Sequence, residues 1–203
     1  MKKLWLLACI LFVFTTAGPN LPGTASTEAF GGTSDWTDPN NILADDGIPT
    51  QVANGNGTTY LLKATNFGFS IPAGSTINGI TGTWEASVTI GVSWRNVDQH
   101  AIKAGVVGGT PDGGANQQDL TTSYAVYTAG GTTDNWNTTW TVSDVNNSGF
   151  GFGISCENAN DPDDLSVDYM KLAVDYTEGA SGRTHRVIGY GRGITKDIIT
   201  KGN

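Results

Sequence analysis

The clearest pattern in the chain is the alternation of apolar and polar residues between positions 80 and 94. One face of an extended strand there would carry Ile80, Gly82, Trp84, Ala86, Val88, Ile90, Val92 and Trp94. Thr, Ser, Glu, Gly and Arg occupy the positions between them. Because successive side chains of a strand point to opposite faces, this pattern predicts one long strand with a buried and a solvated face, as in antiparallel sheets.

Two short runs repeat the same spacing of large apolar residues. NFGFSI covers residues 66–71 and GFGFGI covers residues 149–154, so each run places Phe, Phe and Ile at alternate positions. Both runs predict strands that line a common core, and their glycines would let another backbone approach closely. Cys156 continues the inward register of the second run, which predicts a buried thiol and not a nucleophile.

Further period-two segments predict strands at residues 60–65, 100–107, 123–128, 138–142 and 165–176. In the last segment the alternation changes phase near Tyr169, which indicates a β-bulge. SDVNNS, residues 143–148, predicts a helical turn capped by Ser143. Together these elements predict an all-β, two-sheet antiparallel sandwich of jelly-roll type, with a short helical turn and an irregular C-terminal tail.

Residues 1–18 have the pattern of a bacterial secretory signal peptide. Two lysines precede an apolar run, and small residues suit cleavage after Ala17. We therefore expect three parts: the signal peptide, a sandwich domain at residues 19–178 and a tail at residues 179–203. No later run is apolar enough to span a bilayer, so the mature chain is expected to be exported and extracellular, without stable membrane insertion. LLAC, ending at Cys9, offers lipidation as a lesser alternative.

Charge is distributed unevenly along the chain. Residues 19–178 hold 18 acidic and four basic side chains, whereas the tail holds five basic residues and one acidic residue. The acidic domain argues against nucleic acid or an anionic membrane as its partner. The tail is expected to be a plain extension, or to dock on the acidic domain of another copy, on an anionic envelope polymer, or on an open sheet edge.

Three segments carry a resemblance to known proteins: ATNFGFSIPAGSTINGI, WTVSDVNNSGFGFGI and LSVDYMKLAVDY. They resemble motifs of jelly-roll-like β-sandwich modules in secreted bacterial proteins and in bacteriophage virion and tail proteins, which also begin with an acidic, Asn-rich stretch such as SDWTDPNNILADDG. VDYMKLAVDY is similar to the last strand of many carbohydrate-binding jelly rolls. The resemblance implies the sandwich fold over residues 30–176 and no shared activity, and the signal peptide departs from the phage setting.

The sequence does not indicate an enzyme. It contains no GxSxG nucleophile elbow, no HExxH zinc helix and no phosphate-binding glycine loop. A glycosidase would need two carboxylates at a fixed separation, and no pair stands out among the many Asp residues.

Acidic loops suggest calcium, since hard cations take several oxygen ligands. The strongest candidates lie in the loop NANDPDDLS and are Asp161, Asp163 and Asp164. A second acidic group near the start of the domain contains Asp35, Asp38, Asp45 and Asp46. Simple solvation of these loops is the competing interpretation.

Sugar binding would require exposed aromatic rings with polar neighbours. Trp136, in the loop TTDNWNTT, and Trp36 are the candidate ligand-binding residues, with Trp94 and Trp140 also available. A buried or loop-anchoring Trp is the competing interpretation for each of them.

We therefore expect a non-enzymatic extracellular structural or adhesion module that assembles through its edge strands and basic tail. A carbohydrate-binding module is the alternative, and a phage virion decoration or tail-fibre protein is a further one. The expected partners are other copies of the chain or a cell-surface polymer or glycan.

Overall fold

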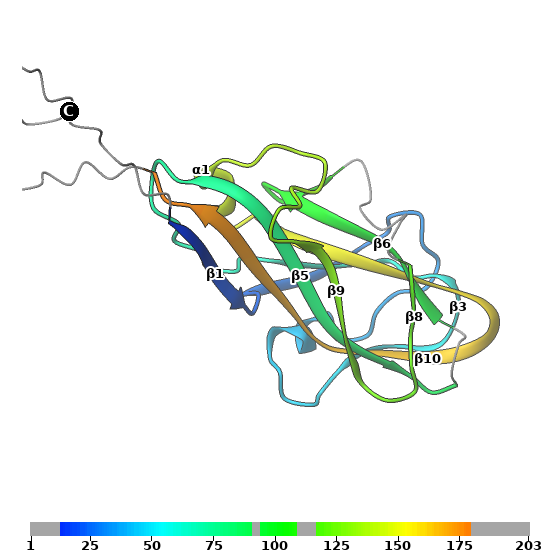
Figure 1. Ribbon diagram of the computed structural model, residues 1–203. Helices are drawn as coiled ribbons and strands as arrows, with labels where there is room; N and C mark the ends of the chain where they lie inside the picture. The colour runs from blue at the N-terminus through cyan, green and yellow to red at the C-terminus, as the bar shows by residue number, and fades with distance from the viewer. Residues whose placement is uncertain (1–12, 91–93, 109–116, 180–203) are drawn as a thin grey trace, which may run out of the picture.

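The computed structural model describes residues 13–90, 94–108 and 117–179. This part contains ten strands, a four-residue α-helix and a 3-10 helix (Figure 1). Their bounds are β1 (Phe14–Asn20), β2 (Thr24–Glu28), η1 (Pro39–Leu43), β3 (Thr50–Thr58), β4 (Leu61–Thr65), β5 (Thr76–Val88), β6 (Trp94–Lys103), β7 (Val106–Val107), β8 (Gln118–Asp119), β9 (Ala125–Gly131), α1 (Val142–Val145) and β10 (Gly151–Thr177).

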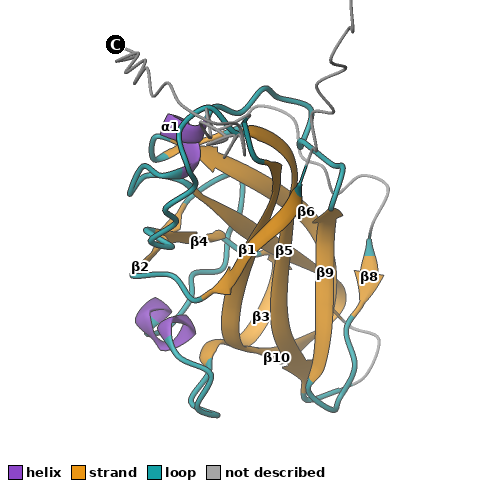
Figure 2. Ribbon diagram, turned by 60° about the vertical axis from the view of Figure 1, so that its left-hand side comes forward, coloured by secondary structure: helices purple, strands orange, loops and turns teal. Residues whose placement is uncertain are grey.

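Strand β10 organises the fold because it bends back on itself and belongs to both layers (Figure 1). Its first arm, residues 151–158, pairs with β4 on one side and β6 on the other. Its second arm, residues 165–177, pairs with β5, and on its other side with β3 and β1. Strand β3 also continues across the bend and pairs with Glu157 and Asn158 of the first arm. Strands β2, β7 and β8 extend the first layer and β9 extends the second (Figure 2). The fold is the antiparallel two-sheet sandwich of jelly-roll type that the sequence predicted.

The aromatic residues of the two repeated runs meet in the core, as predicted. The rings of Phe67 and Phe152 lie 6.3 Å apart, and those of Phe69 and Phe150 lie 5.8 Å apart. However, residues 66–71 form no strand. Asn66 and Gly68 have positive φ angles of 61° and 67°, so this segment leaves the sheet after β4 while its alternate side chains stay buried.

The predicted single strand at residues 80–94 is wrong, because the chain breaks into β5 and β6. Ile80, Trp84 and Val88 are buried as expected, but Ile90 is 57% exposed. The N–H of Ile90 donates to the carboxylate of Asp163 at the bend of β10. These bonds hold the chain at the edge of one layer, where it turns toward the other.

The segment at residues 138–142 is also not a strand. It is a loop that leads into α1, and the cap of α1 is Thr141, not Ser143. The Thr141 hydroxyl accepts from the N–H of Asp144 at 3.1 Å, and the Asp144 carboxylate accepts from the N–H of Thr141 at 2.9 Å. This reciprocal capping box satisfies two backbone donors that the short helix leaves free.

The predicted bulge in the last strand is confirmed. Register with β5 shifts between Val167 and Met170, so Asp168 and Tyr169 together lie opposite Glu85. Leu165 and Val167 face inward before the shift, and Met170 and the following even-numbered residues face inward after it. The extra residue therefore explains the change of phase.

Part of the predicted signal peptide lies within the sheet. Strand β1 begins at Phe14 and pairs with β10 through Ala17. Removal of the signal peptide stays a prediction. None of the helices in the described ranges has the length and apolar character needed to cross a membrane.

Candidate functional site

The loop that follows β9 places Trp136 inside the molecule. Its ring is only 4% exposed, and its Nε1–H donates to the carbonyl oxygen of Ile80 at 2.8 Å. The backbone N–H of Trp136 donates to the Asp134 carboxylate at 2.8 Å. The first bond ties the indole to β5 in the second layer, and the second bond shapes the loop itself.

The backbone at this point is strained. Trp136 and Asn137 are consecutive residues with positive φ angles of 54° and 53°. Asn tolerates this left-handed conformation, but a bulky residue such as Trp rarely adopts it. Such strain costs on the order of 1–3 kcal/mol per residue and is concentrated at functional sites. The loop is therefore a candidate site on backbone grounds.

Trp140 lies farther along the same loop and is partly exposed. Its Nε1–H donates to the carbonyl oxygen of Asn135 at 2.9 Å, and its ring meets the buried ring of Phe150 edge to face at 5.1 Å. The ammonium group of Lys103 lies 5.5 Å from the centre of the indole ring. The ring is thus held in place on several sides while part of it faces solvent.

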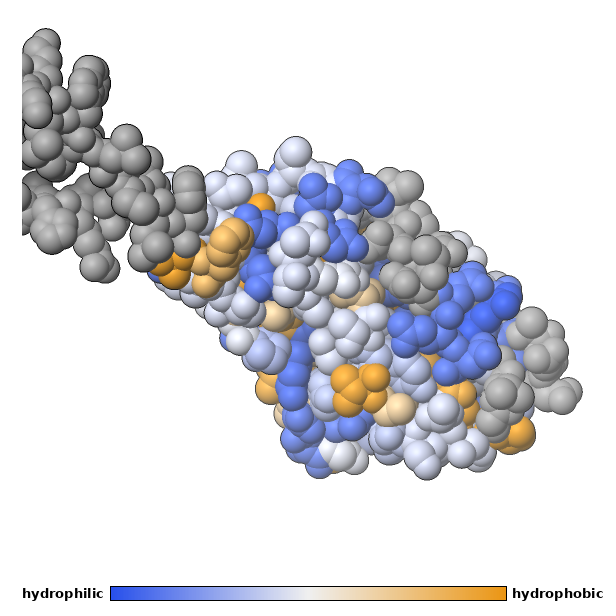
Figure 3. All heavy atoms as spheres, in the orientation of Figure 1, coloured by the Kyte–Doolittle hydropathy of each residue, from blue (hydrophilic) through white to orange (hydrophobic). Residues whose placement is uncertain are grey.

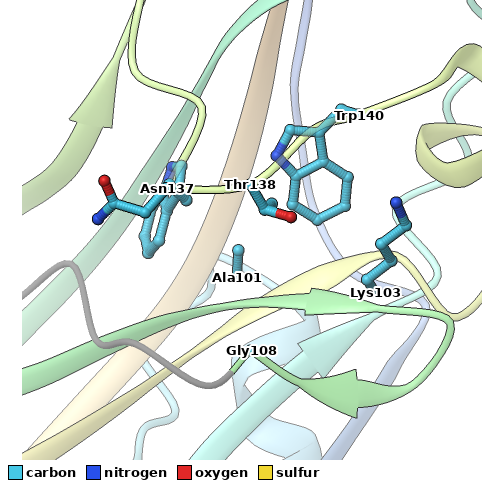
Figure 4. Close-up of a pocket in the computed structure, with 7 residues that line it drawn as sticks. Ala101, Lys103, Gly108, Asn137, Thr138 and Trp140 are labelled. Carbon is cyan, nitrogen blue, oxygen red and sulfur yellow. The ribbon is translucent and has the colours of Figure 1, made fainter.

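A small cavity of about 140 Å³ opens beside Trp140 (Figure 4). The hydroxyl of Thr138 lies next to the indole, and Lys103 approaches from the end of β6 (Figure 4). The full lining is Ala101, Lys103, Gly108, Trp136, Asn137, Thr138 and Trp140. A second, more open hollow of about 570 Å³, between the turn before β5 and the start of α1, shares Trp140 as a wall. We call the two hollows together the Trp140 site.

The charge of Lys103 is balanced within the site. Its ammonium group donates to the carbonyl oxygen of Thr139 at 3.0 Å and forms an ion pair with Asp144 at 2.9 Å. Partial burial raises the pKa of Asp144, but hydrogen bonds from Lys103 and Thr141 outweigh it, and the pKa lies below its usual value. The site is polar without a net charge of its own, which suits a neutral ligand.

The two predicted ligand-binding tryptophans do not offer open ring faces. Trp36 is buried, and its Nε1–H donates to the carbonyl oxygen of Tyr60 at 2.8 Å. Trp136 lines the small cavity but Trp36 does not, so the structure does not bring them together. Both are buried rings of the competing interpretation, since each donates its N–H to a backbone carbonyl inside the protein. Ligand binding by either residue stays a prediction.

The predicted calcium ligands are largely engaged with backbone donors. Asp163 is buried and accepts from the N–H groups of Ile90 and Asp164, and the Asp164 carboxylate accepts from the N–H of Asn54 at 2.7 Å. The side chain of Asp161 lies outside the described residues. No three His, Cys, Asp or Glu side chains gather as metal ligands in the described ranges. Carboxylate oxygens that already accept hydrogen bonds from N–H groups have less capacity left for a cation. Calcium at this loop stays a prediction.

A second polar group surrounds the bulge of β10. Asp168 is 3% exposed, and its Oδ1 atom has no hydrogen-bond partner. Burial, together with the charges of Asp45 and Asp46, raises its pKa, although the N–H groups of Gly47 and Ile48 act in the opposite direction. The loop at residues 44–48, through Gly47 and Ile48, therefore lies against a buried carboxyl group whose pKa is raised.

The sequence names Trp140 only as one of several available tryptophans, inside a predicted strand, and does not single it out. It gives no indication of Lys103, which comes from a different layer. The signal in the sequence is the Trp-rich composition of the loop. The positive φ angles, which turn one indole inward and keep the other at the surface, cannot be predicted from it.

Hydrophobic surface is divided into small areas. Figure 3 shows separate hydrophobic patches among neutral and hydrophilic residues on one face. The large exposed hydrophobic side chains are Val13, Phe14, Phe30, Ile48, Ile90, Val106, Tyr124 and Val126. Scattered single residues of this kind need no functional explanation.

Comparison with known proteins gives distant structural likeness alone. No family model matches the chain, and no curated protein matches its sequence. The CBM22-1 xylan-binding domain of Paenibacillus barcinonensis Xyn10C is 10% identical, with a TM-score of 0.38 over 82% of this chain and 97% of that one. A family 16 carbohydrate-binding module is 13% identical, with a TM-score of 0.34 over 72% and 95%. The N-terminal cellulose-binding domain of Cellulomonas fimi β-1,4-glucanase C is 15% identical, with a TM-score of 0.28 over 66% and 79%. TM-scores this low carry no functional argument.

Proposed function

We propose that this protein is a non-enzymatic binding module that takes a carbohydrate at the Trp140 site. The observation that carries the proposal is the partly exposed indole of Trp140, fixed by its own hydrogen bond and flanked by Thr138 and Lys103. A sugar ring presents an apolar face and a rim of hydroxyl groups. The site offers the matching pair, an aromatic surface with hydroxyl, amide and ammonium groups around it.

The dimensions of the site favour a surface-bound polymer over an enclosed small molecule. Pockets that bury drug-sized ligands measure roughly 300–1,000 Å³. The small cavity has about 140 Å³ and therefore holds only part of a ligand. Because Trp140 lines both hollows, we expect a linear glycan to lie across both, with one of its units on the indole. Preorganisation of the ring reduces the entropy lost on binding.

The test is glycan binding by Trp140→Ala against the native chain. Stacking of a sugar on the indole buries apolar surface worth about 1.5–3 kcal/mol, so the variant should bind at least about tenfold more weakly. Xylan and cellulose oligosaccharides are the first ligands to measure by titration calorimetry, followed by a broad glycan array. Trp140→Phe should recover part of the affinity.

A matched control is Tyr124→Ala. Tyr124 is 47% exposed and precedes β9, whereas the Trp140 loop follows it, so the two lie about 20 Å apart along the strand. This variant should bind as the native protein does. Equal binding by Trp140→Ala and the native protein, with both folded by circular dichroism, would refute the proposal.

A self-assembling structural or adhesion module is the second candidate. The observation that favours it is that β1 and β9 each pair with one neighbour in the described part of the chain. Open edges are templates for strands of other copies. Light scattering after size exclusion should then show a mass that grows with protein concentration, and a constant monomer mass would exclude assembly.

A further inference from the structure

Strand β1 fills an edge of the second layer with residues that the sequence assigns to the signal peptide. Phe14 pairs with Thr177 and Ala17 with Val174, and the next pair after an irregularity joins Asn20 to Leu172. In Figure 1, β1 lies along the last part of β10. Ala17 also packs against the hydrophobic core. Four of the five registered pairs would therefore disappear on cleavage after Ala17.

Cleavage would leave one side of β10 open from Val174 to Thr177. The other side stays paired with β5, through Val174 with Ile80 and Thr177 with Thr76, so the strand itself remains in the sheet. Val174 and Tyr176 are buried and face the core at this edge. A hollow of about 570 Å³ adjoins the edge, and Phe14 and Thr15 of β1 form part of its wall. A row of free backbone groups beside a buried apolar strip accepts an added strand.

We propose that the chain's own tail takes this place, and that residues 183–188, RTHRVI, pair with β10 once the signal peptide is gone. The tail leaves directly from the end of β10, and five residues, EGASG, separate Thr177 from Arg183. That link is the length of a common hairpin loop and contains two glycines. A strand returning from it runs antiparallel to β10, in the same direction as β1.

The charge and composition of residues 183–188 suit the replacement of β1 by the tail. The segment carries Arg183 and Arg186, whereas the edge carries Asp175, whose carboxylate is bonded by the Thr16 hydroxyl in the present arrangement. Thr184, Val187 and Ile188 are β-branched residues that favour strands. A short covalent link gives the tail a high effective concentration at its own edge, which favours it over the tail of a second copy. The proposal does not depend on carbohydrate binding.

Hydrogen exchange of the backbone amides, measured on the secreted protein, tests whether the tail replaces β1. The full chain is exported from a bacterial host, and intact mass gives the N terminus of the product. We expect a monomer that begins after Ala17 and whose amides at residues 174–177 exchange slowly. In a chain ending at Gly179, those of these amides that point away from β5 should exchange at least about tenfold faster, since each lost backbone hydrogen bond has about that effect.

Point variants keep the test independent of truncation. Proline cannot donate a ladder hydrogen bond. The backbone N–H groups of neighbouring strand residues point in opposite directions, so one of residues 187 and 188 must donate toward β10. At least one of Val187→Pro and Ile188→Pro should therefore accelerate hydrogen exchange at residues 174–177. Ile198→Pro, farther along the tail, is the matched control and should have no effect. Unchanged exchange in the truncated and proline variants would overturn the proposal. A product that retains residues 14–17, or an oligomer that loses the protection on dilution, would overturn it as well.

Discussion

Cys156 shows how the fold sets the chemistry of a single side chain. It lies on the first arm of β10, beside the buried Phe152 and Ile154, and complete burial raises the pKa of its thiol to about 12. Only the thiolate is a nucleophile. The residue therefore acts as a small apolar part of the core.

Cys156 should resist alkylation in the folded protein. With its pKa at about 12, almost no thiolate forms at pH 8, and the closed core excludes the reagent. Peptide mass spectrometry after iodoacetamide treatment should find Cys156 unmodified in the native protein and fully modified in guanidinium. A cysteine introduced by Ser70→Cys, at an exposed position, is the positive control. Rapid native labelling of Cys156 would show that the core opens easily.

At the scale of elements, the sequence predicted the strands better than the connections. Alternation at residues 165–176 located both the last strand and its bulge, because the inward positions there are filled by unambiguous apolar residues. The same reasoning failed at residues 80–94. Ile90 has the right polarity and spacing for the core, but hydrogen bonds from the distant bend of β10 hold the chain at the surface. Alternation records side-chain preference and does not record such long-range bonds.

The candidate site was predictable only as a region. The Trp-rich loop after β9 could be identified from its composition, whereas the orientation of each indole could not. Trp136 is buried because its N–H reaches the carbonyl oxygen of Ile80, more than fifty residues earlier in the chain. Trp140 is partly exposed, with its ring packed edge to face on Phe150 and the ammonium group of Lys103 over it.

The bulge of β10 and the loop over it should make stability depend on pH. The pKa of Asp168 is raised by burial and by Asp45 and Asp46, and that of Glu85 is raised by burial, Asp168 and Asp45, with Lys171 opposing. A raised pKa means that the folded state binds the proton more tightly than the unfolded chain. The stabilisation is therefore complete below the unfolded pKa, near 4, and is lost as pH rises through the folded pKa.

Asp168→Asn should remove the contribution of Asp168 to this loss and lessen that of Glu85, since an amide keeps the shape of the carboxyl group without its charge. Urea unfolding from pH 3 to pH 8 should show the variant equal to the native protein at low pH and more stable at neutral pH. Asp119→Asn, at an exposed position, is the matched control. A variant that is less stable at neutral pH would mean that the ionised carboxylate is required there, as for a bound cation.

At the scale of the whole molecule, the long bent strand holds both layers together, and elements of both layers form the Trp140 site. Strand β6 brings Lys103 from the first layer, and the loop after β9 brings Trp136 and Trp140 from the second. The Trp140 site thus depends on the packing of the two layers. Loops set on a rigid scaffold are where binding residues are commonly found.

The most direct test of the proposed carbohydrate site is the response of individual indole N–H signals in the NMR spectrum to added oligosaccharide. Each Trp gives one such signal, and single Trp→Phe variants assign them. We predict that titration with a bound glycan shifts the Trp140 signal most and leaves those of the buried Trp84 and Trp94 unchanged. A bound glycan that shifts signals elsewhere but leaves the Trp140 signal unchanged would contradict the account. A Trp140 signal that no glycan of a full panel shifts would contradict it as well.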